Sequence, residues 1–372
     1  MKYNKKNKLK IATVFSGIGA AEQALKQLNI PHEIVFACDN GERYLDYSVE
    51  DINKIISSKP KSKKEKIIRE LYDSTGKPNN VKTSYFANYD ISENKWYEDV
   101  RFVDGTKYTG EVDLFVGGSP CQSFSTYGHR KGLEDARGTL FYDYARLVKE
   151  IQPKAFIFEN VTGLLNHDGG KTWDVIQEIF KSLNYDIKMQ ILNAADYNLP
   201  QLRRRVFVVG VNKELNCPEY QFPKPVPLKH KSTEYLDEFV PNEYYLGEKG
   251  FNFVTKIERS ARRARVNQDV IGCQTANQQF NWVGDFRVET PTESHMKDDR
   301  IYKGMYNGKL SVARKMTPRE LLRLMGFEDF NIVVKDTVMW RQTGNSIAVP
   351  VIKAVISEII NTLGKAEGEK NE

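Results

Sequence analysis

The sequence predicts an α/β fold, in which a mostly parallel β-sheet carries helices on both faces and a smaller second domain follows. Two observations lead to this prediction. Short β-rich runs alternate with helical patterns along the first two thirds of the chain, and the polar motifs come directly after those runs. Ligands bind at the carboxyl ends of the strands in such sheets, so we expect the motifs to share one edge.

Five runs are predicted to be strands, because each is short, apolar and ended by a turn or a polar residue. They cover residues 11–15, 34–37, 113–116, 155–158 and 206–211. Helical patterns cover residues 20–28, 139–151, 172–183 and 351–363. A charged insertion, residues 53–80, interrupts the alternation, and we expect a surface helix with loops there. Its lysine run is compatible with phosphate contact or with a solvated face.

A proline-rich linker begins at Cys217 and separates the second domain from the first. Residues 229–309 beyond it are rich in Arg, Gln and Asn and show weak β-alternation, which indicates a separate, smaller domain. The length of 372 residues is enough for about two domains. The tail from Gly364 is charged, and we expect it to be disordered.

The composition is that of an ordinary globular protein, with a net charge of +6 that suits nucleic acid without requiring it. The four cysteines form no Cys-x-x-Cys pair, so neither a disulfide framework nor a metal site is predicted. No run approaches the roughly 18 apolar residues that span a bilayer, and the Lys-rich amino terminus lacks the apolar core of a secretory signal. We therefore expect a cytoplasmic protein with no membrane partner.

The first motif is a glycine-rich turn between the first strand and the first helix. Its residues are Phe15, Ser16, Gly17, Ile18 and Gly19. Such a turn lets backbone approach a nucleotide closely, and Asp39, 20 residues after Gly19, has the spacing of an acid that binds a ribose. By itself the motif is equally compatible with a plain strand-to-helix turn.

The second and third motifs each follow a predicted strand. Cys121 comes after Pro120 in a Gly-Gly-Ser-Pro-Cys-Gln sequence, which places the thiol on a rigid turn where it can act as a nucleophile. The alternative is an inert small apolar residue. Glu159 ends the fourth strand, where a buried carboxyl group can serve in acid–base chemistry or merely cap a helix.

Two further motifs lie toward the carboxyl end. Alternate arginines point to one side at a strand edge, so Arg203 and Arg205 are predicted to clamp one anionic group, with a surface basic cluster as the alternative. Asn345 precedes the last predicted helix, where it can cap that helix, contact a ligand, or do both.

Taken together, these motifs resemble those of the DNA (cytosine-5) methyltransferase family of the bacterial restriction–modification type, and they occur in the family's order. The similarity covers residues 9–49, 99–213 and 311–360. The resemblance implies a Rossmann-like S-adenosylmethionine-dependent methyltransferase fold plus a smaller target-recognition domain. It divides the chain into a catalytic domain (1–213), a target-recognition domain (214–339) and a carboxyl-terminal segment that returns to the catalytic domain (340–372).

The resemblance makes Cys121 the nucleophile that adds to C6 of cytosine. The chemistry requires such a group, because C5 alone is too weak a nucleophile to take the methyl group. Glu159 is then expected to hold N3 and the exocyclic amine, with Arg205 near the base and Arg203 supporting the same pocket or a phosphate. The base that removes the C5 proton is not identified, and water is compatible with that role.

S-adenosylmethionine is the cofactor that the resemblance implies. Asp39 matches the ribose acid, and Asp99 matches the acid near the adenine amine; we prefer it to Asp90 because of its interval to Asp113. The full set of expected cofactor residues is Phe15, Ser16, Gly17, Ile18, Gly19, Asp39, Asp99, Val100, Pro120, Leu140, Asn345 and Ser346.

Double-stranded DNA is the expected partner, and the target base must leave the helix to be reached. Residues 123–138 are expected to close over the DNA, and the smaller domain to read the major groove. The expected DNA-contacting residues are Gln122, Ser125, Tyr127, Arg137, Gln274 and Asn277. A monomer is expected, with a possible cognate restriction endonuclease that acts on the same site without stable binding. Residues 53–80 and the linker have no counterpart in the family pattern.

Three other functions account for these motifs less well. A dinucleotide-dependent oxidoreductase explains the glycine turn and Asp39 but leaves Cys121, Glu159 and the arginines without a role. An RNA (tRNA) cytosine-5 methyltransferase shares much of the constellation, and the sizeable polar recognition segment favours duplex DNA over it. A binding module without activity has no support, since every motif residue that the chemistry needs is present. No Asp-Pro-Pro-Tyr-like motif occurs, which argues against methylation of an exocyclic amine.

Overall fold

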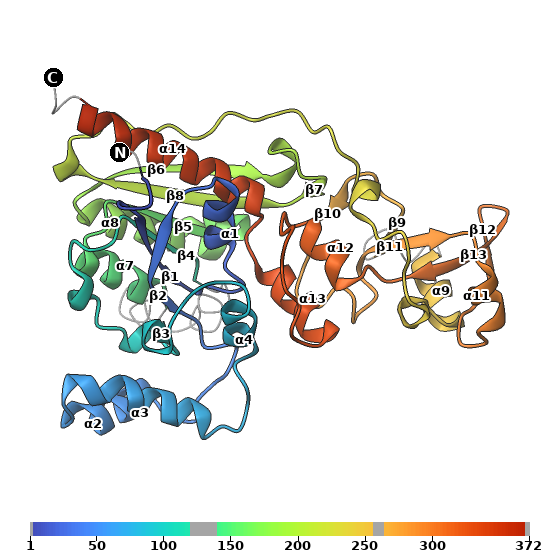
Figure 1. Cartoon of the computed structure of the whole chain (residues 1–372), viewed down its shortest axis with the longest axis horizontal. Helices are drawn as coiled ribbons and strands as arrows, with labels where there is room; N and C mark the ends of the chain where they lie inside the picture. The colour runs from blue at the N-terminus through green and yellow to red at the C-terminus, as the bar shows by residue number, and fades with distance from the viewer. Residues whose placement is uncertain (1–2, 120–139, 256–263, 369–372) are drawn as a thin grey trace. The chain divides into compact units, whose positions relative to one another are not determined.

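The structure is a computed structural model that describes residues 3–119, 140–255 and 264–368 (Figure 1). The chain divides into two compact units. The large unit comprises Met1–Leu192, Arg204–Lys224 and Ile352–Glu372, and the small unit comprises Asn193–Arg203 and Pro225–Val351. The chain thus passes between the units within the arginine motif, since Arg203 and Arg205 belong to different units.

A seven-stranded sheet forms the centre of the large unit, in the order β3-β2-β1-β4-β5-β8-β6. Its strands are β1 (Leu9–Val14), β2 (His32–Cys38), β3 (Trp96–Tyr97), β4 (Leu114–Gly117), β5 (Ala155–Val161), β6 (Tyr185–Asn193) and β8 (Arg204–Asn212). The pairs from β3 to β5 are parallel, whereas β5 and β8 are antiparallel. All five predicted strands are present, so the α/β prediction is confirmed.

Two strands were not predicted. β6 alternates too weakly between buried and exposed positions to stand out in the sequence, because it lies at the edge of the sheet. β3 has two residues, which is too short for a periodic pattern. The edge position of both strands explains why a search for apolar runs misses them.

Aromatic side chains build the core between the sheet and two helices, α7 (Leu140–Ile151) and α8 (Lys171–Ser182). The ring of Tyr144 stacks on Phe115 with centroids 5.1 Å apart, and Phe180 stacks on Phe156 at 5.3 Å. Such contacts add to the burial of large apolar area. The remaining helices of the large unit are α1 (Ala20–Gln27), α2 (Val49–Ser57), α3 (Lys61–Asp73) and α4 (Asn80–Phe86), and α14 (Val349–Gly368) belongs mostly to it.

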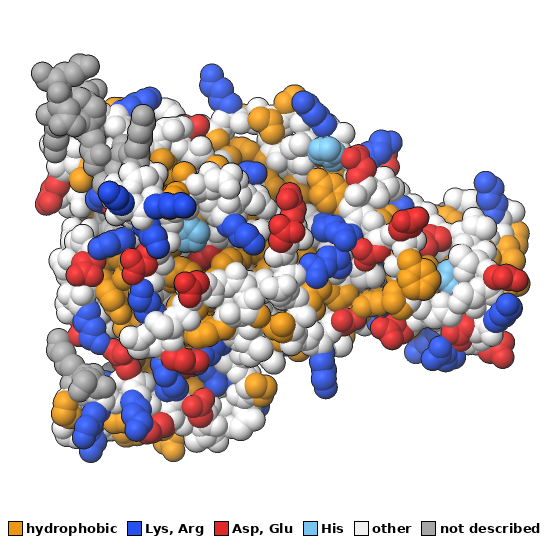
Figure 2. Space-filling view, viewed as in Figure 1, with side chains coloured by type: hydrophobic (Ala, Val, Ile, Leu, Met, Phe, Trp, Pro, Cys, Tyr) orange, Lys and Arg blue, Asp and Glu red, His pale blue; other side chains and the backbone are white. Residues whose placement is uncertain are grey.

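The charged insertion contains two helices, α2 and α3, rather than the single helix expected. They pack through a small core of Ile52, Ile56, Ile68 and Tyr72. Figure 2 shows side chains of both charges mixed over the region of these helices. Within α3, Lys66 pairs with Glu70. This mixture of signs favours a solvated face over a phosphate-binding one.

The prediction of a disordered tail from Gly364 is wrong for residues 364–368, because α14 continues to Gly368. Residues 369–372 lie outside the described residues. Helix α14 also begins at Val349, two residues before the predicted start. Val355, Ile356 and Ile359 are buried, and their packing stabilises the helix. The helix therefore continues past Gly364 into the charged residues that follow it.

The small unit holds a four-stranded sheet in the order β12-β13-β11-β9 and a two-stranded parallel sheet of β10 and β7. The strands are β7 (Gln201–Leu202), β9 (Ala264–Val266), β10 (Ile271–Gly272), β11 (Gly284–Glu289), β12 (Gly304–Tyr306) and β13 (Lys309–Arg314). Its helices are α9 (Glu248–Thr255), α11 (Glu293–Lys297), α12 (Pro318–Arg323) and α13 (Asp336–Asn345). Arg314, in an ion pair with Glu320 of α12, is buried beside this sheet.

Among the described residues, no single helix has the length and apolar composition to cross a membrane, and the bent pair α13–α14 meets that requirement only when both helices are taken together.

Candidate active site

The predicted nucleophile and its loop lie outside the described residues. This applies to Pro120, Cys121, Gln122, Ser125, Tyr127 and Arg137. The chain is described up to Ser119, where it leaves the carboxyl end of β4. The main-chain oxygen of Ser119 accepts a hydrogen bond of 3.0 Å from Nδ2 of Asn160, so the start of the cysteine motif is attached to the end of β5.

Gly118 brings β4 against Glu159. A Cβ atom at this position would lie 2.4 Å from the main-chain oxygen of Glu159 and 3.2 Å from its Oε2 atom. No side chain fits into that space without moving one of the two strands. The glycine is therefore required for the close approach of the cysteine motif to Glu159.

Glu159 and Arg205 form an ion pair across the antiparallel strands β5 and β8, with Nε of Arg205 3.3 Å from Oε1 of Glu159. The side chains are only 13% and 16% exposed, so little water screens the pair. Both predicted residues thus come together at the carboxyl end of β5, the edge at which the cysteine motif begins.

Arg203 binds main-chain oxygens of the small unit. Its Nη1 atom donates to the carbonyl of Gln274 at 2.8 Å, and its Nη2 atom donates to Gly344 at 3.2 Å and to Ser346 at 2.6 Å. The side chain is buried. These contacts differ from the predicted clamp, in which Arg203 and Arg205 share one anion. The difference arises because β8 begins at Arg204, so the strand alternation behind that prediction does not include Arg203.

The glycine turn is held by Asp39 at the end of β2. Oδ2 of Asp39 accepts a hydrogen bond from Gly17 N at 3.0 Å, and Oδ1 accepts one from Gly41 N at 2.8 Å. Burial raises the pKa of the Asp39 carboxyl group, against the effect of these two donors. Phe15, Gly17 and Gly19 all have positive φ angles (52°, 53° and 74°), so the turn has a left-handed backbone that favours glycine.

Space differs between the two glycines of the turn. Among the residues that the structure describes, a Cβ atom at Gly17 would meet only the oxygen of Phe15, at 4.0 Å. One at Gly19 would overlap the ring of Tyr89 at 2.2 Å. The hydroxyl of Tyr89 donates to the main-chain oxygens of Ile18 (3.0 Å) and Gly19 (2.8 Å), and Ser16 Oγ donates to Cys38 O at 3.2 Å. Gly17 is therefore the open point of the turn.

Asp99 caps the turn η2 (Val100–Phe102) at the end of β3. Its Oδ1 atom accepts from Arg101 N and Nε, and its Oδ2 atom accepts from Arg101 Nη2 at 2.6 Å and from the Tyr72 hydroxyl at 2.8 Å. Val100 is buried directly after it. Leu140, at the start of α7, is half-buried.

Asn345 is the last residue of α13 and is exposed, while α14 begins at Val349. The prediction that Asn345 can cap the final helix is therefore wrong. The cap position of α14 is Ala348, directly before Val349, and Asn345 lies three residues before that position. Ser346 is buried and presents its carbonyl to Arg203.

The prediction that Gln274 reads DNA is contradicted by its burial. The side chain is 1% exposed, its Nε2 atom donates to Leu321 O at 3.2 Å, and its main chain contacts Gln201 and Arg203. A buried amide that binds main chain is part of the core of the small unit and does not present its edge to a base. Asn277, three residues later, is exposed.

The comparisons with known proteins identify the family of this chain. Residues 9–361 match the model of the family described as C-5 cytosine-specific DNA methylase, which is nearly the whole chain. The chain belongs to this family. It is accordingly a DNA cytosine-5 methyltransferase, and membership of the family implies S-adenosylmethionine-dependent methylation.

Relatives with similar sequences include type II methyltransferases. M.SsoII of Shigella sonnei is 39% identical over 75% of this chain and 71% of the relative, and M.HpaII of Haemophilus parainfluenzae is 35% identical over 72% and 77%. The orphan methyltransferase M.SPRI of Bacillus phage SPR is 28% identical over 97% of this chain and 100% of its own length.

Solved structures confirm the fold of this cytosine-5 methyltransferase. A DNMT2 mutant from Spodoptera frugiperda superposes with a TM-score of 0.64 at 18% identity, covering 95% of this chain and 99% of the other. Dnmt2 from S. pombe gives 0.62 at 18% identity, with the same coverage. The predicted methyltransferase fold is therefore confirmed.

Sequence reasoning missed several residues that support the site. Tyr72, Asn79 and Tyr89 all contact residues of the predicted cofactor site, and none belongs to a motif. Their only signal in the sequence is that they are polar or aromatic residues within or directly after an insertion of otherwise charged character. Within the described part of the chain, no group of three or more His, Cys, Asp or Glu side chains could hold a metal ion.

Proposed function

We propose that this protein transfers a methyl group from S-adenosylmethionine to C5 of a flipped-out cytosine in duplex DNA, at a specific sequence and as part of a restriction–modification system. The ion pair of Glu159 and Arg205 is the observation that carries the proposal. It supports the proposal because it lies at the point where Gly118 and Ser119 lead the chain into the cysteine motif.

Cys121 would add to C6 of the cytosine as a thiolate, which forms a carbon–sulfur bond and makes C5 nucleophilic. Glu159 would bind N3 and the exocyclic amine, and Arg205 would hold Glu159 and balance negative charge near the base. C5 then takes the methyl group, the C5 proton leaves to a base, and the carbon–sulfur bond breaks. Arg203 would support this site through its carbonyl contacts rather than by touching the base.

The described residues fit the adenosine and methionine parts of the methyl donor. Gly17 leaves open space at a left-handed turn, and Asp39 offers a carboxylate at the end of β2, where ribose hydroxyls can donate to it. When bound, S-adenosylmethionine supplies an electrophilic methyl group on a sulfonium. The residues that would hold it are Phe15, Ser16, Gly17, Ile18, Gly19, Asp39, Asp99, Val100, Pro120, Leu140, Asn345 and Ser346.

Segments 1–213, 214–339 and 340–372 would serve as the catalytic domain, the target-recognition domain and the returning segment. Asn277 stays a proposed DNA contact, together with Gln122, Ser125, Tyr127 and Arg137 of the cysteine loop. The relatives' names as type II enzymes support a cognate endonuclease acting on the same site. Their bacterial sources support a bacterial cytoplasm as the location, and we propose a monomer.

Bisulfite sequencing of an unmethylated plasmid tests the proposal. Wild type with S-adenosylmethionine should protect cytosines within one short motif, and Cys121→Ser should protect none. Cys217→Ser is the matched control, because it removes a thiol from the linker and should protect the same motif as wild type. Protection by Cys121→Ser would exclude the covalent mechanism. If wild type protects no cytosine, the duplex DNA substrate is wrong, and RNA is the next substrate to assay.

A further inference from the structure

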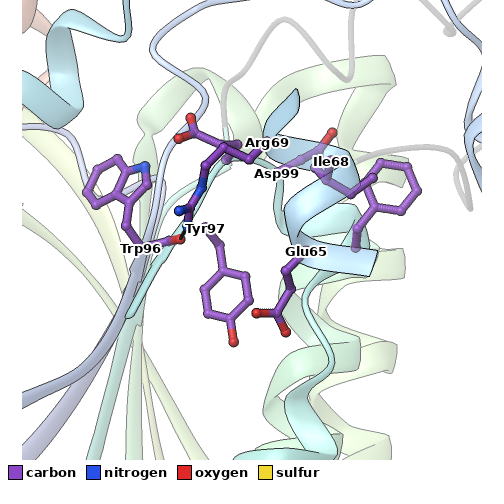
Figure 3. A pocket seen from close by; sticks show the side chains of 8 residues that line it. Glu65, Ile68, Arg69, Trp96, Tyr97 and Asp99 are labelled. Carbon is purple, nitrogen blue, oxygen red and sulfur yellow. Dashed lines mark hydrogen bonds between the residues drawn. The ribbon is translucent and has the colours of Figure 1, made fainter. Parts of the chain in front are cut away.

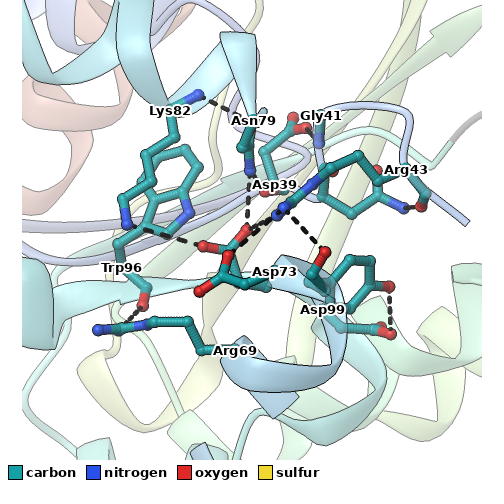
Figure 4. A network of polar contacts seen from close by, with 12 residues as sticks. Asp39, Gly41, Arg43, Arg69, Asp73, Asn79, Lys82, Trp96 and Asp99 are labelled. Carbon is teal, nitrogen blue, oxygen red and sulfur yellow. Dashed lines mark hydrogen bonds and ion pairs between the residues drawn. The ribbon is translucent and has the colours of Figure 1, made fainter. Parts of the chain in front are cut away.

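The α2–α3 insertion, residues 49–79, contacts both acids that would bind the adenosine of the methyl donor. The hydroxyl of Tyr72 in α3 donates to Oδ2 of Asp99 at 2.8 Å. Nδ2 of Asn79 donates to the main-chain oxygen of Asp39 and to Oε2 of Glu98, both at 2.8 Å (Figure 4). A segment with no counterpart in the motif pattern therefore contacts two residues of the proposed cofactor site.

Tyr72 is held by Arg43 and by the core of the insertion. The guanidinium group of Arg43 lies 5.0 Å from the centre of its ring, and Nη1 of Arg43 donates to its main-chain oxygen at 3.5 Å. Nη2 of Arg43 pairs with Glu98, the neighbour of Asp99 in the chain (Figure 4). The Tyr72 side chain is fully buried in the core of the insertion, so its hydroxyl has little freedom to leave Asp99.

Helix α3 is also attached to the segment around β3, which leads into Asp99. Nη2 of Arg69 donates to the main-chain oxygens of Glu93 at 3.0 Å and Trp96 at 3.3 Å. A small pocket between this helix and β3 is lined by side chains of both, as Figure 3 shows. The lining residues are Glu65, Ile68, Arg69, Trp96, Tyr97, Glu98, Asp99 and Phe102. These contacts fix α3, which carries Tyr72, against β3, which precedes Asp99.

The two side chains that donate to Asp99 differ in burial. The Arg101 side chain is 29% exposed, whereas Tyr72 is fully buried. A carboxylate accepts about four hydrogen bonds, and Tyr72 and Arg101 already supply at least that number. A ligand that donates to Asp99 must therefore replace a donor, and the partly exposed guanidinium of Arg101 can turn into solvent while the buried Tyr72 stays.

We propose that Tyr72 is a positioning residue for the adenine of the methyl donor: its hydroxyl holds the Asp99 carboxylate in the orientation that accepts the exocyclic amine. This rests on the proposed function, in which Asp99 faces that amine. Burial, followed by the charge of Asp99, raises the pKa of the Tyr72 hydroxyl, so this hydroxyl stays a donor at neutral pH. The enzyme should then bind adenine, which has an exocyclic amine, more tightly than hypoxanthine, which has a carbonyl at the same ring position. Tyr72 should contribute part of this difference in affinity.

Calorimetric titration of the full chain with S-adenosylhomocysteine and with S-inosylhomocysteine tests this. Wild type should bind the adenosine compound more tightly. Tyr72→Phe keeps the ring and should weaken adenosine binding about tenfold while changing inosine binding little, since one hydrogen bond to a charged group is lost. Tyr185→Phe is the matched control, because it removes a buried hydroxyl that donates to Pro153 O at 2.7 Å, and it should leave the selectivity unchanged.

A double-mutant cycle with Asp99→Asn separates positioning from general stabilisation. If Tyr72 acts through Asp99, Tyr72→Phe should have little effect on the selectivity in the Asp99→Asn background. Equal selectivity in wild type and Tyr72→Phe would overturn the proposal, as would the same loss in both backgrounds. Failure of the proposed function looks different: wild type would then bind neither compound or would methylate no cytosine.

Discussion

Nε of Arg205 lies 3.3 Å from Oε1 of Glu159, across the antiparallel strands β5 and β8 of the large sheet. The pairing register puts Val161 opposite Arg205, so Glu159 is two residues away on the same face of the sheet. The predicted acid–base residue thus has a fixed, partly buried cation beside it. Four predictions follow from this site and from the contacts around it.

Arg205→Lys should lower kcat for DNA methylation about a hundredfold, because a donor that stabilises charge near the base is lost. Lysine keeps the charge but lacks the planar fork that reaches Glu159. Single-turnover methylation of a plasmid fragment measures the effect. Arg204→Lys, at the exposed neighbouring position, should match wild type. If Arg205→Lys methylates DNA as fast as Arg204→Lys, Arg205 does not contribute to catalysis.

Gly118→Ala should reduce methylation about a hundredfold, since displacement of catalytic groups by around 1 Å has such an effect. The new Cβ atom would lie 2.4 Å from the oxygen of Glu159, so β4 and β5 must separate. Gly163→Ala is the control, because its Cβ atom would have ordinary contact with Val161 at 3.9 Å. Full activity of Gly118→Ala in the same assay would show that the spacing of these strands does not matter.

Arg203→Ala should lower the free energy of unfolding of the small unit by about 3 kcal/mol, because buried carbonyl oxygens lose their donor. The affected carbonyls belong to Gln274, Gly344 and Ser346. Urea unfolding followed by fluorescence measures the change. Arg204→Ala should leave the midpoint unchanged, and an equal shift for both variants would mean that these hydrogen bonds contribute little.

Glu22 gives a prediction on pH dependence. Its carboxyl group is buried, and burial raises its pKa despite hydrogen bonds from the hydroxyls of Tyr85 and Thr13. The folded state therefore binds the proton more tightly than the unfolded state. The stability from this group is present at low pH and is lost as the pH rises from about 4.3, the unfolded value, through the raised pKa.

Glu22→Gln cannot ionise and should lack this loss. The difference in free energy of unfolding, variant minus wild type, should increase with pH across that window. Urea unfolding at a series of pH values measures it, with Glu178→Gln, at an exposed position of α8, as the control. Parallel curves for wild type and Glu22→Gln would show that Glu22 titrates normally.

The sequence alone predicted the parallel sheet and the order of the motifs, because both depend on local patterns. Runs such as 114–116 and 206–211 are apolar on both faces, which is typical of strands buried within a sheet. The strand ends carry the polar motifs, so the prediction that these motifs share one edge requires only parallel pairing of strands such as β4 and β5. That prediction needed no knowledge of side-chain directions.

Only the tertiary structure decided which polar side chains are buried and which partners they have. Gln274 and Asn277 look alike in sequence, yet one is in the core of the small unit and the other is exposed. Arg203 and Arg205 are two residues apart, yet Arg203 binds main-chain oxygens and Arg205 pairs with Glu159, since β8 begins between them. Tyr72 reaches Asp99 from an insertion 27 residues away. Periodicity reports the face of one element, whereas such contacts depend on how separate elements pack, and packing is determined by the whole chain at once.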